Sequence, residues 1–307
     1  MKKSLIFGIN GQDGHYLGRL LLEKGHEVLG AGRGQPCGIG GYIACDISDQ
    51  GAVSSVIAKA LPDEIYNLAG ISSPIANEKE PKLAYAVNVK GVENIISAIS
   101  SHCPSARLFQ ASTGYIFSPG PDRKTERSAL GPSGAYGKQK LEAHLLVADA
   151  RKGGMFAANG ILFNHESPLR SADFVTRKVT QAAAAFKQGR RTSQLPMGGL
   201  DSVRDWGFAG DYVEAMRLML QSGAPKDYVI STGIGHSVAD LCGIAFGHVG
   251  LDYGKYVSVE SGIVPQTTPS VLVGDPSLIR KDLNWSAKMP FEELVRMMVD
   301  HDLSQGA

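Results

Sequence analysis

The sequence predicts an α/β protein with a doubly wound parallel sheet and a smaller C-terminal α+β lobe. Short apolar strands alternate with amphipathic helices through the first half of the chain, and a glycine-rich turn separates the first strand from the first helix. Such alternation produces parallel strands joined by helical crossovers, with both faces of the sheet covered. The pattern changes after Asn164, so we expect domains at 1–165 and 166–307, with part of the second returning to the first.

The individual elements follow from apolar runs and their spacing. Residues 4–7 form the first strand, and a helix with four leucines on one broad face follows until Gly25. Further apolar runs predict strands at 26–31, 64–68, 106–112, 156–163 and 228–231. Helical periodicity predicts helices at 52–60, 85–100, 136–150, 174–188, 210–221, 238–247 and 291–301.

Composition is that of a soluble globular chain of 307 residues, with 43% hydrophobic and 20% charged residues. The net charge of +1 gives no sign of a nucleic-acid-binding surface. The four cysteines are scattered without a CxxC pair, which argues against a disulfide framework or a metal site and favours a reducing compartment. No signal-peptide pattern opens the chain and no segment is long enough to span a bilayer, so we expect a cytoplasmic protein.

Gly8, Gly11 and Gly14 form the pattern GxxGxxG directly between the first strand and the first helix. In a dinucleotide-binding Rossmann sheet, one glycine makes the turn, one admits the pyrophosphate and one lets the helix pack on the strand. The positive end of the helix then faces the phosphates. An ordinary strand–helix turn is the alternative, but this position in the chain favours a dinucleotide site.

The end of the second strand indicates which dinucleotide binds. An acidic residue there hydrogen-bonds a ribose hydroxyl of NAD, whereas an arginine accommodates the 2′-phosphate of NADP. Residues 30–34 contain Arg33 and no carboxylate, which favours NADP, with NAD still possible, although a solvated loop arginine would give the same pattern. Asp46, at the end of a further short strand, is expected either to touch the adenine or to cap a helix.

Tyr136 and Lys140 are four residues apart and therefore share one face of a predicted helix. A free phenol titrates at about pH 10, and a neighbouring ammonium would lower its pKa and suit it to acid/base catalysis of carbinol–carbonyl interconversion. A chance YxxxK on a surface helix is the alternative. Ser112 and Thr113, which end the preceding strand, count against it, because Thr113 is placed to hydrogen-bond the substrate oxygen that Tyr136 protonates.

Together with 67–70 and Asn88, these residues resemble the extended short-chain dehydrogenases. Further segments resemble the GDP-mannose 4,6-dehydratases over nearly the whole chain, namely 8–14, 160–168, 174–178, 204–207, 211–216, 274–276 and 291–294. The resemblance implies a parallel Rossmann sheet, a small C-terminal substrate lobe and a GDP-linked nucleotide-sugar substrate.

The resemblance also assigns residues to two binding regions. Cofactor contacts would come from the glycines and from Asn10, Gln12, Asp13, Leu68, Ala69 and His165. Sugar-nucleotide contacts would come from Ser72, Tyr115, Asn164, Val175, Lys178 and Arg204. A diphosphate needs cations, and the last two supply them. Without the resemblance, both would be interpreted as solvated surface charges.

Two positions depart from the dehydratase pattern. In the dehydratases a glutamate two residues after the active-site threonine removes the proton beside the 4-keto carbon, but this chain has Tyr115. Loss of a positioned acid/base costs ~10²–10⁴-fold in rate. The run 112–117 is instead similar to the dTDP-4-dehydrorhamnose reductases. Residues 264–269 lack the arginine that helps to hold the diphosphate in the dehydratases, which puts GDP itself in question.

The retained and lost residues lead to three hypotheses. The first is reduction of the 4-keto group of a GDP-4-keto-6-deoxyhexose, because ketoreduction needs a hydride, Tyr136 and Lys140 but no elimination base. The second is a GDP-mannose 4,6-dehydratase whose base is displaced to Glu126 or Glu166. The third is a non-catalytic cofactor-binding homologue, against which the retained catalytic set argues.

Helices 85–100 and 136–150 carry apolar residues beyond one core stripe, including Val87, Val92, Leu145 and Leu146. The family resemblance suggests that such helices pair across a two-fold axis, and isologous dimers are the commonest soluble oligomers. We therefore expect a homodimer or homotetramer.

Overall fold

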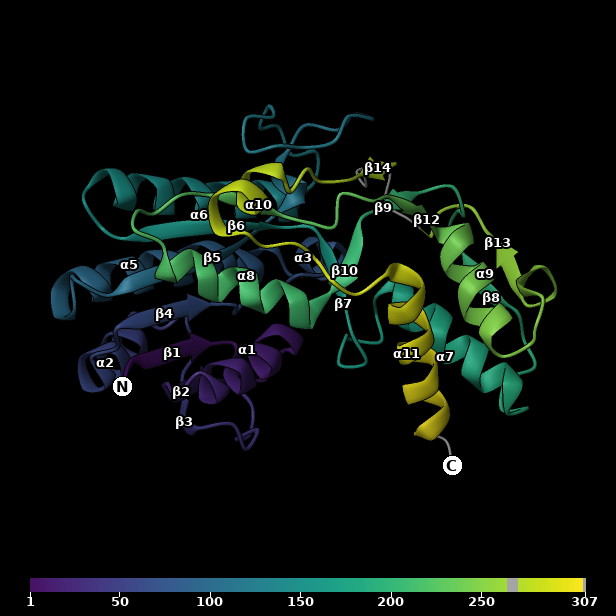
Figure 1. Cartoon of the computed structure of the whole chain (residues 1–307), viewed down its shortest axis with the longest axis horizontal. Helices are drawn as coiled ribbons and strands as arrows, with labels where there is room; N and C mark the ends of the chain where they lie inside the picture. The colour runs from purple at the N-terminus through teal and green to yellow at the C-terminus, as the bar shows by residue number, and fades with distance from the viewer. Residues whose placement is uncertain (264–269, 306–307) are drawn as a thin grey trace.

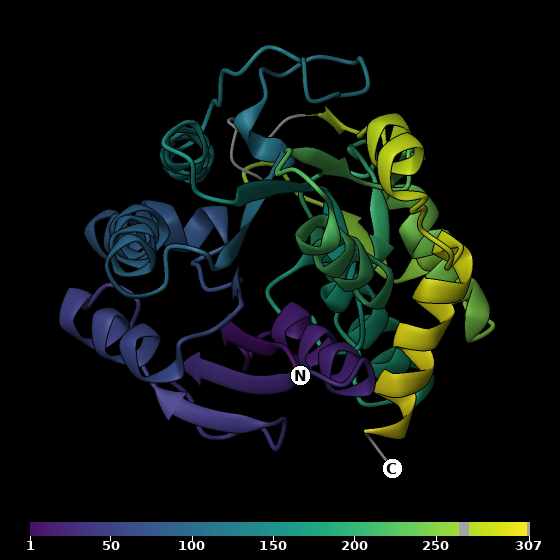
Figure 2. The same cartoon turned by 60° about the vertical axis from the view of Figure 1, so that its left-hand side comes forward.

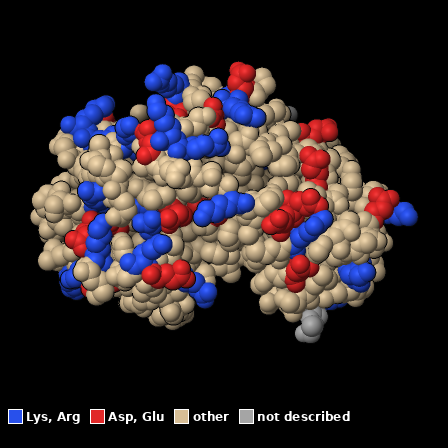
Figure 3. All heavy atoms as spheres, in the orientation of Figure 1, with Lys and Arg blue, Asp and Glu red and all other residues tan. Residues whose placement is uncertain are grey.

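The computed structural model describes residues 1–263 and 270–305. Figure 1 shows a larger layered α/β part beside a smaller, mainly helical lobe near the C-terminus. No helix in the described ranges is long and apolar enough to cross a membrane. Lysines and arginines are interspersed with acidic side chains over the face seen in Figure 3, and neither sign dominates it.

A seven-stranded sheet forms the centre of the larger part. Its strands are β1 (Lys3–Phe7), β2 (Glu27–Gly32), β3 (Gly41–Ala44), β4 (Glu64–Asn67), β5 (Arg107–Thr113), β6 (Ala157–Leu162) and β11 (Tyr228–Ile230). Their order is β11-β6-β5-β4-β1-β2-β3, and every neighbouring pair is parallel. The predicted doubly wound fold is therefore confirmed. The strand order reverses beside β1, and in such sheets ligands bind outside the carboxyl ends of the strands at that point.

Alternating side chains bury both faces of this sheet. Leu5 and Phe7 pack with α2 (Gln50–Ala60), α5 (Gly91–His102) and α6 (Ala135–Lys152), whereas Ile6 packs with α1 (Gln12–Glu23) and α8 (Ala209–Gln221). Figure 2 shows the two helical layers on opposite sides of the strands. Period-two alternation thus sends neighbouring residues of β1 into two separate cores.

The second half of the chain serves both parts of the molecule. Strand β11 forms one edge of the main sheet, and helices α8 and α10 (Ser277–Leu283) lie against that sheet. The smaller lobe packs α7 (Val175–Lys187), α9 (Val238–His248) and α11 (Phe291–Ser304) around a separate core. Short strands pair outside the main sheet: β7 (Asn164–Glu166) with β10 (Trp206–Phe208), β9 (Val203–Arg204) with β12 (His236–Ser237) and β14 (Val271–Leu272), and, within the smaller lobe, β8 (Leu195–Met197) with β13 (Val257–Val259).

The helix predicted at 85–100 is interrupted. The chain forms α3 (Pro74–Lys79), α4 (Pro81–Tyr85), a π-helical turn at Ala86–Lys90 and then α5. Asn88 in this turn is buried, and its amide contacts the backbone of Ile71 and the side chains of Asn77 and Gln139. A π turn inserts one residue into the helix, and here it carries a polar side chain that fastens the β4–α3 loop.

The apolar residues that we assigned to a subunit interface are not all exposed. Val87 and Val92 are only 5% and 1% exposed and belong to the core under the sheet, so that part of the prediction is wrong. Leu145 of α6 is 47% exposed and remains available at the surface. The error arose because helical spacing does not distinguish a core stripe from a second apolar face.

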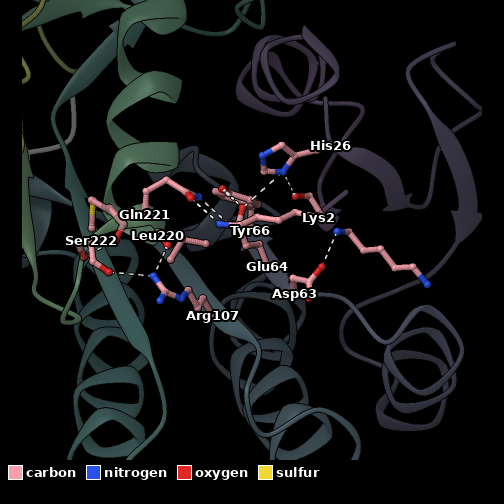
Figure 4. A network of polar contacts seen from close by, with 12 residues as sticks. Lys2, His26, Asp63, Glu64, Tyr66, Arg107, Leu220, Gln221 and Ser222 are labelled. Carbon is pink, nitrogen blue, oxygen red and sulfur yellow. Dashed lines mark hydrogen bonds and ion pairs between the residues drawn. The ribbon is translucent and has the colours of Figure 1, made fainter. Parts of the chain in front are cut away.

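A polar network fastens α8 to the amino ends of the central strands (Figure 4). Glu64 is 1% exposed, and its carboxylate accepts hydrogen bonds from Lys2, Gln221 and Tyr66. Arg107 donates to the carbonyl oxygen of Leu220 in the last turn of α8 and to that of Ser222, which follows the helix. These contacts lie at the end of the sheet opposite the carboxyl ends that form the site.

Candidate active site

A cavity of about 440 Å³ lies at the carboxyl ends of the central strands. It is lined by the β1–α1 turn, by residues following β4, by the end of β5, by the start of α6, and by residues of the smaller lobe. Most residues proposed from the sequence line this one space: Gly8, Gly11, Gln12, Asp13, Gly14, Leu68, Ala69, Ser72, Thr113, Tyr115, Tyr136, Lys140, Asn164, His165, Val175, Lys178 and Arg204.

The three glycines of the β1–α1 turn differ in what they make possible. Gly8 has a φ of 87°, and a Cβ there would lie 2.7 Å from the backbone nitrogen of Ala69. A Cβ on Gly14 would lie 2.3 Å from the carbonyl oxygen of Gly8. A Cβ on Gly11 would meet only that oxygen, at 3.4 Å. The protein itself therefore needs glycine at 8 and 14, while Gly11 leaves open space at the turn, which fits the approach of a pyrophosphate.

An ion pair ties this turn to the second half of the chain. His165 lies 2.8 Å from the Asp13 carboxylate through Nε2, and its Nδ1 lies 2.8 Å from the carbonyl oxygen of Phe163. Burial alone would raise the pKa of Asp13 and lower that of His165, but their mutual attraction reverses both shifts. Ser167 donates to Gln12 next to this pair. The residues proposed for cofactor binding thus hold one another in place.

Tyr136, Lys140 and Thr113 meet at the end of β5. Lys140 Nζ donates to the carbonyl oxygen of Ala111 at 2.5 Å, and the Tyr136 phenol is hydrogen-bonded with Thr113. Thr113 also accepts from the backbone nitrogen of Tyr115. Burial lowers the pKa of Lys140 to about 8. A lysine of this kind exchanges its proton close to neutral pH.

The expected effect of Lys140 on the phenol is not seen. Burial raises the pKa of Tyr136 to about 12, and hydrogen bonding with Thr113 only partly opposes it. The Lys140 ammonium donates to the backbone of β5. The prediction that Lys140 depresses the phenol pKa is therefore wrong for this arrangement, in which desolvation dominates.

Tyr115 lines the cavity beside the Tyr136 phenol. Its ring lies 5.8 Å from the ring of Tyr136 in an edge-on arrangement. Neither proposed displaced base lines the cavity: Glu126 accepts from the backbone nitrogen of Val229, and the buried Glu166 accepts from Thr176. Among the described lining residues, the only carboxylates are Asp13, which is paired with His165, and the exposed Asp173.

The smaller lobe supplies the cationic end of the cavity. Arg204 is buried and donates to the carbonyl oxygens of Val203 and Ser270, so it is not a solvated charge. Lys178 is exposed on the first turns of α7, next to Val175. Arg170 also lines the cavity, stacks 3.5 Å from the ring centroid of Phe174 and pairs with Glu166 at 3.3 Å.

Sequence reasoning missed Arg170. It stands two residues after the recognised segment 160–168, and only the fold brings it to the cavity. The uncharged segment 264–269, which we compared with the dehydratase diphosphate clamp, lies outside the described residues.

Three residues proposed for the cofactor lie outside the cavity lining. The Asn10 amide donates to the carbonyl oxygen of Gln35 and supports the loop after β2. Arg33 in that loop is 61% exposed, and its guanidinium lies 3.8 Å from the Asp46 carboxylate. Asp46 accepts from Ser48 and is not a helix N-cap, since Asp49 caps α2.

Comparison with known proteins agrees with this geometry. The sequence model of the GDP-mannose 4,6 dehydratase family matches residues 40–298. GDP-mannose 4,6 dehydratase 2 of Arabidopsis thaliana is 38% identical over 98% of this chain and 87% of its own length.

Solved structures share the fold at low identity. The UDP-glucose 4-epimerase of Thermotoga maritima, solved with UDP-glucose, has a TM-score of 0.89 at 19% identity and covers 99% of this chain and 100% of its own. The protein RMD of Pseudomonas aeruginosa, solved with NADPH, has a TM-score of 0.83 at 17% identity and covers 99% and 98%.

The parallel sheet, the glycine turn and the tyrosine–lysine pair define an NAD(P)-dependent enzyme of the extended short-chain dehydrogenase/reductase type. Within that type, the chain belongs to the GDP-mannose 4,6-dehydratase family, whose sequence model matches most of its length. The sequence-based assignment to this family is therefore confirmed.

Proposed function

We propose that the enzyme transfers hydride between NADP and C4 of a GDP-linked hexose, with Tyr136 as the acid/base. The observation that carries this proposal is the position of Tyr136, Thr113 and Lys140 in one cavity, between the glycine turn and the cations of the smaller lobe. Hydride chemistry belongs to the nicotinamide. The chain contributes the proton at the sugar oxygen, through Tyr136, and the hydrogen bond from Thr113 that orients that oxygen.

The electrostatics of the cavity suit a nucleotide diphosphate sugar. Arg170, Lys178 and Arg204 place three cations on the lobe side, where a diphosphate would lie. The open space at Gly11, facing the N-terminus of α1, suits the pyrophosphate of the cofactor. Both anionic ligands would then reach the catalytic tyrosine from opposite ends of the cavity.

The first candidate for the complete reaction is 4,6-dehydration of GDP-mannose, which membership of the family supports. In this reaction C4 is oxidised, water is eliminated next to the new ketone, and the cofactor is recycled. The elimination needs a base for the proton beside the ketone. Asp13 is held by His165, so among the described lining carboxylates this role would fall to Asp173.

The second candidate is reduction of a GDP-4-keto-6-deoxyhexose, and a specific observation favours it. Tyr115 stands where the elimination base would be, with its ring against Tyr136. Reduction needs only the hydride, the proton from Tyr136 and the support of Lys140. The cofactor would then be consumed stoichiometrically.

Two incubations of the purified protein separate the candidates. GDP-mannose with a trace of NADP, followed by mass spectrometry, would show the loss of one water if the enzyme is a dehydratase. NADPH with GDP-4-keto-6-deoxymannose would show the loss of nicotinamide absorbance if it is a reductase. An inactive protein in both incubations, with NADPH nevertheless bound, would overturn the proposal and favour a non-catalytic homologue.

A further inference from the structure

Three buried amide side chains form a row across the neighbouring strands β4, β5 and β6 (Figure 1). Asn67 pairs in register with Gln110, and Gln110 pairs with Asn159. Their exposed fractions are 0%, 2% and 0%. Leu108, two residues before Gln110, belongs to the core beneath α5 and α6, so the row faces these helices. Buried polar groups need hydrogen-bond partners, and each amide of the row donates to one.

The orientation of the first two amides is fixed by their neighbours. The backbone nitrogen of Ala69 can only donate, and it meets Oδ1 of Asn67 at 3.3 Å. Nδ2 of Asn67 therefore faces Gln110 and donates to its Oε1 at 2.8 Å. Nε2 of Gln110 then donates to the carbonyl oxygen of Ala111 at 3.0 Å. Turning either amide over would bring donors against donors and acceptors against acceptors.

The carbonyl oxygen of Ala111 also accepts from the catalytic lysine. Lys140 Nζ lies 2.5 Å from it, so this oxygen serves both Lys140 and Gln110. Strand β4 pairs with β5 only as far as Gln110, whereas β5 continues to Thr113, which leaves backbone beyond Gln110 for side chains. A carbonyl oxygen has lone pairs for two donors. The two positive donor ends repel each other, however, so each one weakens the bond of the other.

The other groups around Lys140 do not hold its charge. Tyr136 and His144 are the titratable side chains one turn to either side on α6, and the charge of Lys140 lowers the pKa of His144. Strand β5 presents uncharged residues such as Ser112, and the π-helical turn that packs on α6 presents the uncharged Asn88. Among the described residues, no carboxylate contributes to the pKa of Lys140, which burial lowers to about 8.

We propose that Gln110 is a positioning residue for the catalytic lysine, and that it acts by sharing the Ala111 carbonyl oxygen with the Lys140 ammonium. The proposal rests on the role of Lys140 in the function proposed above. Gln110 is not among the described residues that line the cavity, so it reaches the reaction only through Lys140. An ammonium that shares its acceptor is stabilised less than one that has the acceptor to itself, and it releases its proton more readily.

The first test is Gln110→Met, which keeps the length of the side chain but removes the amide donor. The Ala111 oxygen would then serve Lys140 alone, so the pKa of Lys140 should rise by roughly half to one pH unit, as expected for one ordinary hydrogen bond. NMR of protein labelled with [13Cε]lysine measures this titration. Ordinary lysines titrate at about 10.4, which separates Lys140 from them, and Lys140→Met identifies its signal.

A second variant, Gln110→Glu, retains the shape of the side chain and an acceptor for Asn67. A carboxylate beside the Ala111 carbonyl would attract the ammonium directly, so the pKa of Lys140 should rise by about one pH unit or more. This variant tests whether the side chain at 110 reaches Lys140 even if Gln110→Met does not fold.

Asn159→Leu is the matched control. Asn159 belongs to the same buried row and donates to the carbonyl oxygen of His144 on α6 at 3.2 Å, but it does not contact the Ala111 oxygen. Its substitution should lower the melting temperature and leave the titration of Lys140 unchanged. In kinetics, the alkaline limb of the kcat–pH profile should move upward in Gln110→Met and stay in place in Asn159→Leu, because the ammonium form of Lys140 supports the Tyr136 phenolate.

Two results would overturn the proposal. One is an unchanged Lys140 titration in Gln110→Met or in Gln110→Glu. The other is an equal rise in Asn159→Leu, which would mean that any loosening beneath α6 reduces the burial of the lysine. If the unmodified enzyme acts on neither GDP-sugar, the proposed function fails, while the lysine titration still tests the shared carbonyl.

Discussion

At the scale of single residues, Tyr115 separates the two candidate reactions. Its ring lies 5.8 Å from that of Tyr136. In a ketoreductase, Tyr115→Glu would place a carboxylate beside the phenol and raise the pKa of Tyr136 further, because like charges disfavour the phenolate. A rise of one pKa unit would make the phenol a weaker acid and slow reduction by at most about tenfold near neutral pH. A trace of water elimination from GDP-mannose should appear, since a carboxylate is restored at that position.

The control for this prediction is Tyr115→Gln, which changes the shape without adding charge. Both variants are assayed for NADPH consumption and for dehydration of GDP-mannose. If the unmodified enzyme already dehydrates GDP-mannose at an ordinary enzymatic rate, the argument from Tyr115 is wrong and the base must be sought at Asp173.

Arg33 tests the choice of cofactor. It follows the end of β2 in a loop whose carbonyl oxygens, at Gly32 and Gly34, both contact the Tyr42 hydroxyl. A guanidinium held there suits the 2′-phosphate that distinguishes NADP from NAD. Arg33→Ala should weaken NADPH binding by at least about tenfold, as expected for a lost charge-assisted hydrogen bond, and leave NADH almost unchanged. Equal weakening of both in calorimetry would contradict the assignment.

At the scale of elements, the glycine turn is the most sensitive connection. A Cβ on Gly14 would lie 2.3 Å from the Gly8 carbonyl oxygen, which is backbone and cannot move aside cheaply. We expect Gly14→Ala to lower the melting temperature and to abolish measurable NADP binding, because α1 must shift away from β1. Gly243→Ala in α9, where nothing lies within 4 Å, should instead stabilise the protein by roughly 0.5–1 kcal/mol. Thermal scans with and without NADP compare the two.

The sequence predicted the longer helices and strands because the buried apolar residues of each one recur at a regular spacing along the chain. The strands β1, β5 and β6 and the helices α6, α7 and α8 start within two residues of their predicted positions. The π turn at 86–90 and the two- and three-residue strands of the lobe escaped prediction. Pairings that short depend on distant partners and leave no periodic signal.

The residues of the candidate site likewise divide into those that a local sequence pattern predicts and those that it does not. Motifs identified the glycines, Tyr136 and Lys140, because their spacing reflects a local strand–turn–helix or a single helix face. Arg170 reaches the cavity, and His144 meets Asp227, only because the fold brings together segments that are distant in sequence. No spacing rule predicts such contacts. The pKa of Tyr136 was mispredicted for a related reason: burial, which a motif does not report, raises it.

At the scale of the whole molecule, assembly remains a prediction. The apolar side chain of Leu145 is exposed on α6, whereas those of Val87 and Val92 are buried in the core. We expect sedimentation at micromolar concentration to show a dimer or tetramer, and Leu145→Glu to shift it toward monomer while leaving the melting temperature of the monomer nearly unchanged. A monomeric unmodified protein would contradict the prediction.

The acid stability of the whole fold should depend on Glu64, which joins β4 to the N-terminus and to α8. Burial raises its pKa, but hydrogen bonds from Lys2, Gln221 and Tyr66 outweigh burial, so the net shift is downward. A pKa depressed in the folded state adds stability above the unfolded value of about 4.3, and this stability is lost as the pH falls through the folded pKa. Glu64→Gln should therefore destabilise the protein at pH 7 by roughly 1–3 kcal/mol, the cost of disturbing a buried charged hydrogen bond.

The difference from the unmodified protein should shrink as the pH falls from about 4.3 through the lower folded pKa, because the carboxylate is protonated first in the unfolded state and only then in the folded state. Denaturant unfolding at a series of pH values measures this difference. Glu292→Gln is the matched control, since Glu292 is 57% exposed and pairs with Arg296 on the surface of α11; exposed pairs of this kind contribute about 0–1 kcal/mol. A stability difference for Glu64→Gln that is independent of pH would mean that the side chain contributes only packing, and that the network in Figure 4 does not hold α8 through charge.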